Sequence, residues 1–503
     1  MKELLPDESS FYICTLKIVM KFLFVNFLIS IYKQRYAFFV ALALSFSVTA
    51  TEKEIEKKSD VESVEQRLKT DIAELDRRFK QLSFKIYQEL TTNSKHSELK
   101  FSTMAVLDTN IRQALVKDSS ILAISLIHIN LQLIVENINE PTIPNYIKLL
   151  LDGNEYETAN QLFQLIKDDG DELYIATTSV LFASYHSQRN EWQEILATLN
   201  IDLSELPAEL LDRAYMLIGT ALQHLRSHRN AVKIYEKIPD DSKDYPLAQL
   251  NIAVAHIRQD WWTDAHIVMN QLLKNGQVTQ NEELVNRLHL MLGYSLLNKE
   301  FFREARESFR NVGVNSQYTN KALMGISLSA ISQKDFNGAI HTLSILKEKK
   351  SKPLVVEESH LLLPHVYKML EQYQTANTGY AQAIDYYQKR LMQLEAMISN
   401  DTFYNLDNTS LIEDSIFIMT DSAFQIDENY PPYFMANYLT LKELSFHSFS
   451  SETTQELTIL IKDYSFCFNK AIKTILMKRI AQIESYLSQA RYSLAKLYDN
   501  NNE

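Results

Sequence analysis

Bulky and small side chains recur with a long period through the middle of this 503-residue chain. Each recurrence places a bulky residue first, a small or apolar residue three positions later, and a second bulky residue four positions after that. Spacings of three and four bring side chains onto one face of a helix, so each triplet predicts a helix with one packed face. The seven triplets are Tyr156/Ala159/Phe163, Trp192/Ile195/Leu199, His228/Ala231/Tyr235, Trp262/Ala265/Met269, Phe302/Ala305/Phe309, Phe336/Ala339/Leu343 and Tyr373/Ala376/Tyr380.

The central residues of the triplets lie 36, 36, 34, 40, 34 and 37 positions apart. A second small residue stands twelve positions before five of them, where it would let a facing helix approach closely. Each repeat is therefore predicted to be a pair of helices. One pair cannot bury its own apolar face, so the copies must stack on one another. The second small residues are Ala183, Gly219, Ala253, Gly293 and Ser327, and apolar Ile218, Ile252, Leu292 and Ile326 precede the last four.

These repeats resemble the tetratricopeptide (TPR) family, whose pattern runs W-x2-L-G-x2-Y, then A-x3-F, then P. The resemblance implies an all-α, right-handed superhelical solenoid of about seven helix pairs over residues 141–398. Three departures stand out. Pro364 occupies the close-packing position of the last repeat, where we expect it to kink or break the helix. Pro141 and Pro144 fall where the first helix of the first repeat would begin, and Ile195 replaces the usual alanine.

Residues 51–140 are predicted to form a helical, partly coiled-coil region. Apolar residues recur there at alternating spacings of four and three, which is a heptad seam over residues 68–86. The seam either joins two copies of the chain into a homo-oligomer or folds back on the repeats. Residues 107–135 are predicted to form one or two further, buried helices. The seam residues are Leu68, Ile72, Leu75, Phe79, Leu82 and Ile86.

Two regions follow the repeats. Residues 399–453 lack a clean period and contain Pro431-Pro432, so we predict an irregular insertion with loops and short helices. Helical spacing returns over residues 454–503. That segment is predicted to be an amphipathic helix that either caps the solenoid or lies along its groove.

Residues 1–50 have the pattern of a targeting segment. An apolar run over residues 36–50 follows Lys33 and Arg35 and ends in the small-residue sequence Val48-Thr49-Ala50. The segment is either a cleaved signal peptide or an uncleaved membrane anchor. In both cases the positive-inside rule predicts that the repeats are exported, so we expect a periplasmic protein, soluble or anchored at the inner membrane. Of the two cysteines, Cys14 lies in the leader and Cys467 has an aromatic setting typical of a buried thiol.

Composition supports a helical, acidic protein. With 9 Gly and 10 Pro, the chain has few turns of the kind that sheets and phosphate loops need. The formal net charge is −12, and removing five basic and three acidic residues with the leader leaves 46 basic against 60 acidic residues, or −14. Nucleic acid is therefore not expected as a partner.

The sequence contains none of the common catalytic motifs, so no catalytic residue, cofactor or metal ion is expected. His224, His228 and His256 fall at successive helix and turn positions inside the repeats and are interpreted as core or groove residues. The acidic residues around Gly170 are interpreted as a solvated turn, because the twelve-residue calcium-loop pattern is missing.

If TPR geometry applies, the first helix of each repeat lines a concave groove, which here would be mostly apolar with basic residues near its edge. Such a groove suits an apolar helix or extended segment of a protein partner. The alternative is that the chain's own C-terminal helix fills it. The predicted groove residues are Arg213, Met216, Thr220, Leu250, Val254, Arg287, Leu290, Tyr294, Lys321, Met324 and Leu328.

Two functions remain open at this point. The first is a non-enzymatic periplasmic scaffold that binds another envelope protein and supports the assembly or regulation of a cell-envelope complex. The second is an envelope enzyme, for example one acting on peptidoglycan, with a site within residues 403–451 that uses Glu413 or Glu428. Nothing around either glutamate marks it as catalytic.

Overall fold

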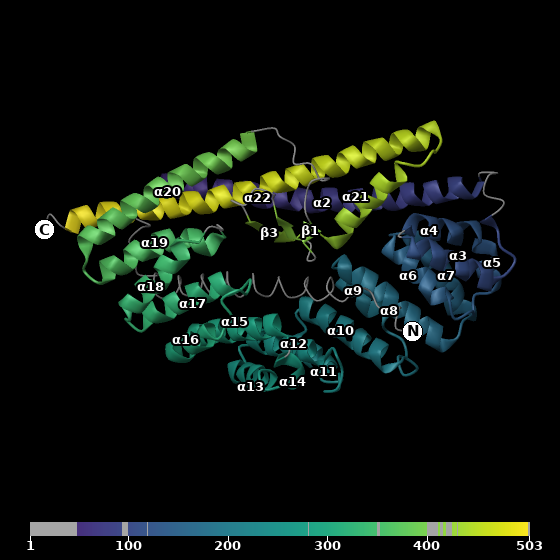
Figure 1. Ribbon diagram of the computed structural model, residues 1–503, viewed down its shortest axis with the longest axis horizontal. Coiled ribbons are helices and arrows are strands. Elements are labelled where there is room, and N and C mark those ends of the chain that lie inside the picture. Colours follow the sequence, from purple (N-terminus) through teal and green to yellow (C-terminus); the bar gives the residue numbers. More distant parts are fainter. Residues whose placement is uncertain are drawn as a thin grey trace. The chain divides into compact units, whose positions relative to one another are not determined.

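A computed structural model describes residues 48–92, 99–117, 119–279, 281–349, 353–399, 411–412, 416–418, 425–429 and 431–500 (Figure 1). The predicted leader, residues 1–50, lies outside the described residues except for its last three. Among the residues that the structure describes, no helix is both long enough and apolar enough to cross a membrane.

Contacts divide the chain into two compact units. Of the residues described, those between 68 and 255 and those in 431–468 form the first unit, and those in 48–67, between 256 and 429, and in 469–500 form the second. Three helices run from one unit into the other: α2 (Val48–Thr92), α12 (Tyr245–Arg258) and α22 (Ser451–Asn500).

The seven predicted repeats are seven consecutive helix pairs. In every pair the second helix begins at the first residue of the sequence triplet. The chain is thus an array of paired helices of the predicted kind. The pairs are α6 (Ile143–Asp152) with α7 (Tyr156–Asp169), α8 (Glu172–Gln188) with α9 (Trp192–Thr198), α10 (Ala208–His224) with α11 (His228–Tyr235), α12 with α13 (Trp262–Leu272), α15 (Glu282–Asn298) with α16 (Phe302–Arg310), α17 (Thr319–Ser332) with α18 (Phe336–Lys347), and α19 (Leu354–Met369) with α20 (Tyr373–Ser399).

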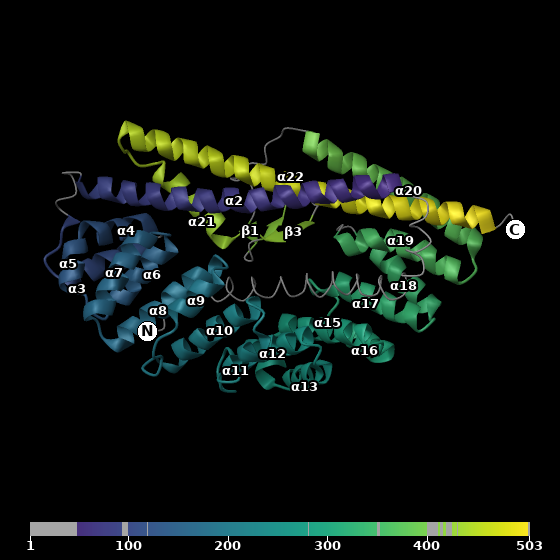
Figure 2. The ribbon, with the colours of Figure 1, turned by 180° about the vertical axis from the view of Figure 1, so that it is seen from behind.

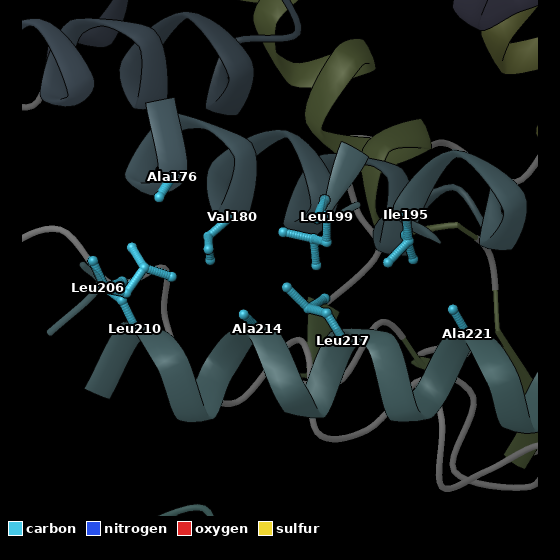
Figure 3. Packing of buried hydrophobic residues seen from close by; sticks show 10 residues of the cluster. Ala176, Val180, Ile195, Leu199, Leu206, Leu210, Ala214, Leu217 and Ala221 are labelled. Atoms are coloured by element: carbon cyan, nitrogen blue, oxygen red, sulfur yellow. The ribbon is translucent and has the colours of Figure 1, made fainter. Parts of the chain in front are cut away.

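The predicted close-packing positions are buried. All seven central residues of the triplets, Ile195 included, are 0% exposed. Where the facing position is glycine, an aromatic ring fills the space: a Cβ atom added to Gly293 would lie 2.6 Å from the ring of Phe309, and one added to Gly219 would collide with Tyr235. Figure 3 shows aliphatic packing between two successive pairs of the first unit, where Ala176 and Val180 of α8 and Ile195 of α9 face Ala214, Leu217 and Ala221 of α10.

Every helix pair turns through one residue in the left-handed conformation, two positions before the second helix. None of these residues is glycine, although a side chain in this conformation costs about 1–2 kcal/mol. The sequence therefore contained no glycine signal for the turns. The seven residues, with φ between 59° and 65°, are Asn154, Asn190, Arg226, Asp260, Glu300, Lys334 and Glu371.

Two expectations about proline are corrected. Pro364 does not break its helix, because α19 continues through it from Leu354 to Met369. Gly379 of α20 faces the proline ring and leaves room for it, since a Cβ atom at Gly379 would lie 2.8 Å from the Cβ of Pro364. The first repeat does have a leading helix, α6, in which Pro144 takes the first turn, where a missing N–H costs nothing.

The region before the repeats folds onto the first unit. Helix α2 buries the seam residues Ile72, Leu75, Phe79, Leu82 and Ile86. Three short helices follow it, α3 (Met104–Val116), α4 (Ser120–Ile129) and α5 (Leu131–Glu136), where one or two were expected. Helix α4 is buried on nearly all sides, as its sequence predicted.

Ion pairs join α2 to the start of α22 within the first unit. Arg78 lies 2.7 Å from Asp463, and Lys85 contacts Glu452 and Glu456 at 2.9 and 3.0 Å. The heptad seam therefore packs inside its own chain, which supports the alternative in which it folds back.

The insertion differs from its prediction. It contains a three-stranded antiparallel sheet of β1 (Leu411–Ile412), β2 (Ile416–Ile418) and β3 (Gln425–Asn429), followed by one helix, α21 (Pro432–Leu444). Leu411 pairs with Phe417, and Ile416 with Asn429. Helix α21 lies beside α22 in both ribbon views (Figures 1 and 2), and Phe434 packs its ring 5.0 Å from that of Tyr464.

The C-terminal segment is one helix, α22, that begins at Ser451. In the second unit its residues pack on the last repeat: the Tyr486 and Tyr387 rings are 5.8 Å apart, and Asn377 donates to the Tyr498 hydroxyl at 3.3 Å. These contacts join α22 to the last repeat, and the choice between capping and groove filling stays a prediction. Cys467 is buried, as predicted. The remaining element is the single turn α14 (Gly276–Thr279).

Candidate functional site

The predicted groove residues lie on the first helices of four successive repeats. Nine of them are buried, and only Lys321 and Leu328 are half-buried. Partner contact at these positions stays a prediction, and the accessible part of the set is confined to α17. Arg213, Met216 and Thr220 lie on α10, Leu250 and Val254 on α12, Arg287, Leu290 and Tyr294 on α15, and Lys321, Met324 and Leu328 on α17.

Several of these side chains connect neighbouring helices. In the first unit, the Thr220 and Tyr235 hydroxyls are 3.2 Å apart, and Gln223 bonds both Tyr235 and the Asn251 carbonyl of the next repeat. In the second unit, the Tyr294 hydroxyl donates to the Lys321 carbonyl at 2.8 Å. Contacts of this kind bind one repeat to the next and hold the array in register.

Arg287 is also part of this interior. Arg287 is only 9% exposed. Burial lowers the pKa of Arg287 to about 10, and a hydrogen bond with Tyr318 opposes that effect. The arginine therefore remains charged at neutral pH while bonded inside the array.

Two of the three histidines singled out in the sequence stack or pack on tryptophans. In the first unit, His224 stacks on Trp192 with ring centroids 3.9 Å apart. In the second unit, His256 packs against Trp261 at 5.6 Å. Within the described part of the chain, no three His, Cys, Asp or Glu side chains are grouped so that they could hold a metal ion.

A buried polar cluster in the first unit was not foreseen from the sequence. Asn154, in the left-handed turn of the first repeat, donates to Asp76 of α2 at 2.9 Å and to Asn437 of α21 at 3.1 Å. Asn437 donates to Asp76 at 3.0 Å and to the Tyr464 hydroxyl of α22 at 3.1 Å. One turn of the first repeat is thus bonded to α2 and α21, and through Asn437 to α22.

Cations balance the charge of Asp76 in this cluster. Lys80 lies 2.9 Å and Arg189 lies 3.6 Å from its carboxylate. Burial alone would raise the pKa of Asp76, but Arg189 and Lys80 outweigh burial and hold that pKa below its usual value. The guanidinium of Arg189 also stacks on the Tyr185 ring at 3.5 Å. The Asp76 carboxylate is thus held by two cations and two amide groups, and the cluster acts as a clamp between helices.

A second buried cluster lies beside the first. Ser83 of α2 donates its hydroxyl to Glu155, whose other oxygen lies 3.4 Å from His128, and His128 stacks on Tyr87. A serine nucleophile must bond to a base that can take its proton and must reach a substrate. Here the serine bonds to a carboxylate, but it is 0% exposed, so a substrate cannot reach it. The arrangement joins α2 to the first repeat and is unsuited to nucleophilic catalysis.

The second unit contains an equivalent clamp. Glu357 of α19 accepts from Arg390 of α20 at 2.6 Å, and its other oxygen lies 2.9 Å from Arg479 of α22. The Tyr387 hydroxyl donates to the Glu357 carbonyl at 2.8 Å. The carboxylate is 0% exposed, so one buried anion joins the last repeat to the C-terminal helix.

The neighbouring residue, Glu358, predicts a pH dependence. Burial raises the pKa of Glu358 from 4.5 to about 7. Because the folded-state pKa is the higher one, the folded protein holds a proton that the unfolded chain has lost, and stability falls as pH rises from about 4.5 to about 7. We expect Glu358→Gln to remove this loss, which amounts to about 3 kcal/mol at pH 8.

Urea unfolding of Glu358→Gln and the parent at pH 4.5 and pH 8 measures the difference. Glu395→Gln, at an exposed position of α20, is the matched control. An equal gap between Glu358→Gln and the parent at both pH values would contradict the expectation.

The candidate enzyme site gains no support from the described residues. Glu413 lies outside them, and Glu428 lies in β3.

No protein-family model and no curated protein matches this sequence. Among solved structures, the apo form of RapI is similar over 71% of this chain and 96% of its own, with 12% identity and a TM-score of 0.40. By their sequence pattern and their paired helices, the repeats are tetratricopeptide-like.

Two further structures show the same general likeness. A Rap protein complexed with competence and sporulation factor is similar over 72% of this chain and 99% of its own, with 13% identity and a TM-score of 0.26. A chain of the APC/C hetero-tetramer Cut9–Hcn1 matches over 59% of this chain and 55% of its own, with 14% identity and a TM-score of 0.30. At these identities the likeness concerns the helical fold alone.

Proposed function

We propose that this TPR-like protein is a non-enzymatic scaffold that binds another protein of the bacterial cell envelope and supports the assembly or regulation of an envelope complex. The observation that carries the proposal is the succession of seven helix pairs, in each of which the second helix begins at the first residue of the sequence triplet. Arrays of stacked repeats present extended surfaces of the kind that bind proteins and peptides.

The clamps at Asp76 and Glu357 fit this role. Each places a buried carboxylate between two cations and joins end helices to a repeat within its own unit. Helices that are held in place within a unit lose little conformational entropy when a partner binds, so more of the contact energy appears as affinity. Of the groove residues only Lys321 and Leu328 are half-buried, and Leu328 also packs against the core of the second unit.

A crosslinking experiment tests the groove. We expect a photo-crosslinking amino acid at Lys321 or Leu328 to join the full-length protein to another polypeptide in cells. Tyr294 and Met324 are poor places for the probe, because they are 8% and 1% exposed and a bulky side chain would disrupt the repeats. Glu304, exposed on α16, is the control position. Intramolecular products alone at Lys321 and Leu328 would end the groove hypothesis.

The proposed location rests on the leader, residues 1–50. Fractionation of the same cells is expected to place the protein in the periplasm, with an amino terminus at Thr51 if the leader is cleaved. Recovery of the whole chain from the cytoplasm would rule out the envelope role while leaving the crosslinking result intact.

A further inference from the structure

One carboxylate in the second unit is largely buried and has no partner. Glu358 of α19 is 9% exposed, and within the described part of the chain neither of its oxygens accepts a hydrogen bond or belongs to an ion pair. These oxygens are also not among the fully enclosed polar atoms that lack a partner, so the carboxylate can be reached from outside. The neighbouring Glu357, by contrast, is bound by two arginines. A buried carboxylate costs free energy unless a cation or hydrogen-bond donors compensate it.

Two tyrosines lie within electrostatic reach of Glu358 but do not compensate it. Burial raises the pKa of Tyr294, and the charge of Glu358 raises that pKa further. Burial, then Tyr486 and then Glu358 raise the pKa of Tyr387. Each phenol has a single hydrogen to donate, and both tyrosines donate it to backbone carbonyls. The carboxylate therefore has acidic and neutral neighbours but no donor.

Basic residues of the surrounding helices do not compensate Glu358 either. Burial is the only cause of its raised pKa, so among the described residues of the helices packed around α19 no charge offsets the effect. The basic residues of these helices include Lys321 of α17, Lys347 of α18, Arg390 of α20 and Arg479 of α22. The two arginines pair with Glu357 instead.

The repeat pattern places Glu358 in line with the predicted groove. It stands eighteen positions before the central residue of its triplet, and Arg213, Arg287 and Lys321 hold the same position in their own repeats. Lys321 lies on α17, which packs against α19. The edge of the predicted groove thus changes from a basic to an acidic residue in the last repeat.

We propose that Glu358 binds a basic side chain, lysine or arginine, from a segment of the protein partner. An ammonium or guanidinium group brings both the positive charge and the hydrogen bonds that this carboxylate lacks. The net charge of −12 also attracts a basic segment at long range. The proposal rests on the proposed scaffold function and specifies the chemistry of the partner.

Charge and ligand number separate this occupant from others. A metal ion needs several ligands, and within the described part of the chain no three His, Cys, Asp or Glu side chains are grouped to hold one. Nucleic acid and anionic membranes would bring negative charge to a carboxylate on an acidic protein. A basic protein segment is the partner that the site favours.

The probe is a library of random 16-residue peptides selected on the full-length protein at pH 8. We expect the enriched peptides to share a lysine or arginine, and their Kd to rise at least tenfold for Glu358→Gln, which keeps the size of the side chain and removes its charge. Glu395→Gln, at an exposed position of α20, is the matched control and should leave the Kd unchanged. Replacing the shared basic residue of the peptide by glutamine should weaken binding to the parent but not to Glu358→Gln.

The pH dependence of binding provides a readout that a purely structural role would not change. Burial raises the pKa of Glu358 to about 7 in the free protein, whereas a bound cation keeps the carboxylate ionised. Binding therefore releases a proton, and the Kd for the parent should fall about tenfold between pH 6 and pH 8. Tyr294 and Tyr387 stay neutral over this range, because the pKa of each is raised above 10. Glu358→Gln should show no such change.

Failure of this inference differs from failure of the groove hypothesis. The crosslinks at Lys321 and Leu328 test whether a polypeptide occupies the groove, whatever its charge, and they leave Glu358 unchanged. Crosslinks to another polypeptide, combined with peptide binding that Glu358→Gln does not weaken, would refute the role of Glu358 alone.

Three further results would overturn the proposal. The first is enrichment of peptides without basic residues, or the same pH dependence in Glu358→Gln as in the parent. The second is peptide binding that appears only in Lys33→Gln/Arg35→Gln, since the leader of the chain itself would then be the occupant. The third is a dimer in analytical ultracentrifugation that Glu358→Gln dissociates. Cooperative thermal unfolding confirms that each variant is folded.

Discussion

Replacing Phe309 with alanine is expected to destabilise the second unit by about 3–5 kcal/mol, the usual cost of deleting a buried aromatic ring. Phe309 is 1% exposed and lies between two glycines on neighbouring repeats. Gly293 of α15 and Gly325 of α17 both place their backbone so close to the ring that a Cβ atom would collide with it. Neither helix can move into the vacated space without losing its own packing, so a cavity should remain.

Denaturant unfolding followed by circular dichroism measures the loss. Phe301→Ala is the matched control, because that phenylalanine is 55% exposed at the start of the same helix and should change stability by less than about 0.5 kcal/mol. Gly325→Ala tests the same contact from the other side and is expected to cost about 1–3 kcal/mol through overpacking. Equal effects of Phe309→Ala and Phe301→Ala would contradict the packing described for this repeat.

Replacing Glu357 with alanine is expected to cost about 3–5 kcal/mol, because it leaves buried arginines without their counter-charge. Arg390 is 2% exposed in its side chain, and Arg479 is 20% exposed. Burial already lowers the pKa of Arg479 in spite of the nearby Glu357 carboxylate, so removing that carboxylate should make its charge more costly. Because Arg479 belongs to α22, the variant should also loosen this helix from the last repeat.

Limited proteolysis provides a readout that global unfolding does not. Cleavage within residues 469–500 should become faster in Glu357→Ala, while Glu395→Ala at an exposed position of α20 should leave it unchanged. The triple variant Glu357→Leu/Arg390→Met/Arg479→Met should recover most of the stability, because it removes the charges together. A triple variant no more stable than Glu357→Ala would show that the charges are not the cause of the loss.

Only part of the candidate site could be predicted from the sequence. The groove positions were found by counting along the repeat, which placed them correctly on the first helices. Counting could not reveal that Met216, Leu250 and Met324 are nearly inaccessible, because exposure depends on what packs around a helix.

By itself the sequence determined the helix pairs, their phase and the first residue of each second helix. It could do so because these features depend on side chains three and four positions apart, which is a local property. Gly219 and Gly293 follow from the same local pattern, because each packs against an aromatic ring, Tyr235 or Phe309, in the second helix of its own pair.

Only the tertiary structure decided the rest. Asp76 bonds Asn154 across 78 positions and Asn437 across 361, and no periodicity relates residues so far apart. Pro364 remains inside a helix because Gly379, in another helix, leaves space for its ring. The burial of the heptad seam within its own chain likewise depends on contacts with distant segments, such as the start of α22. These outcomes follow from pairwise contacts between distant segments, and such contacts exist only once the chain has folded.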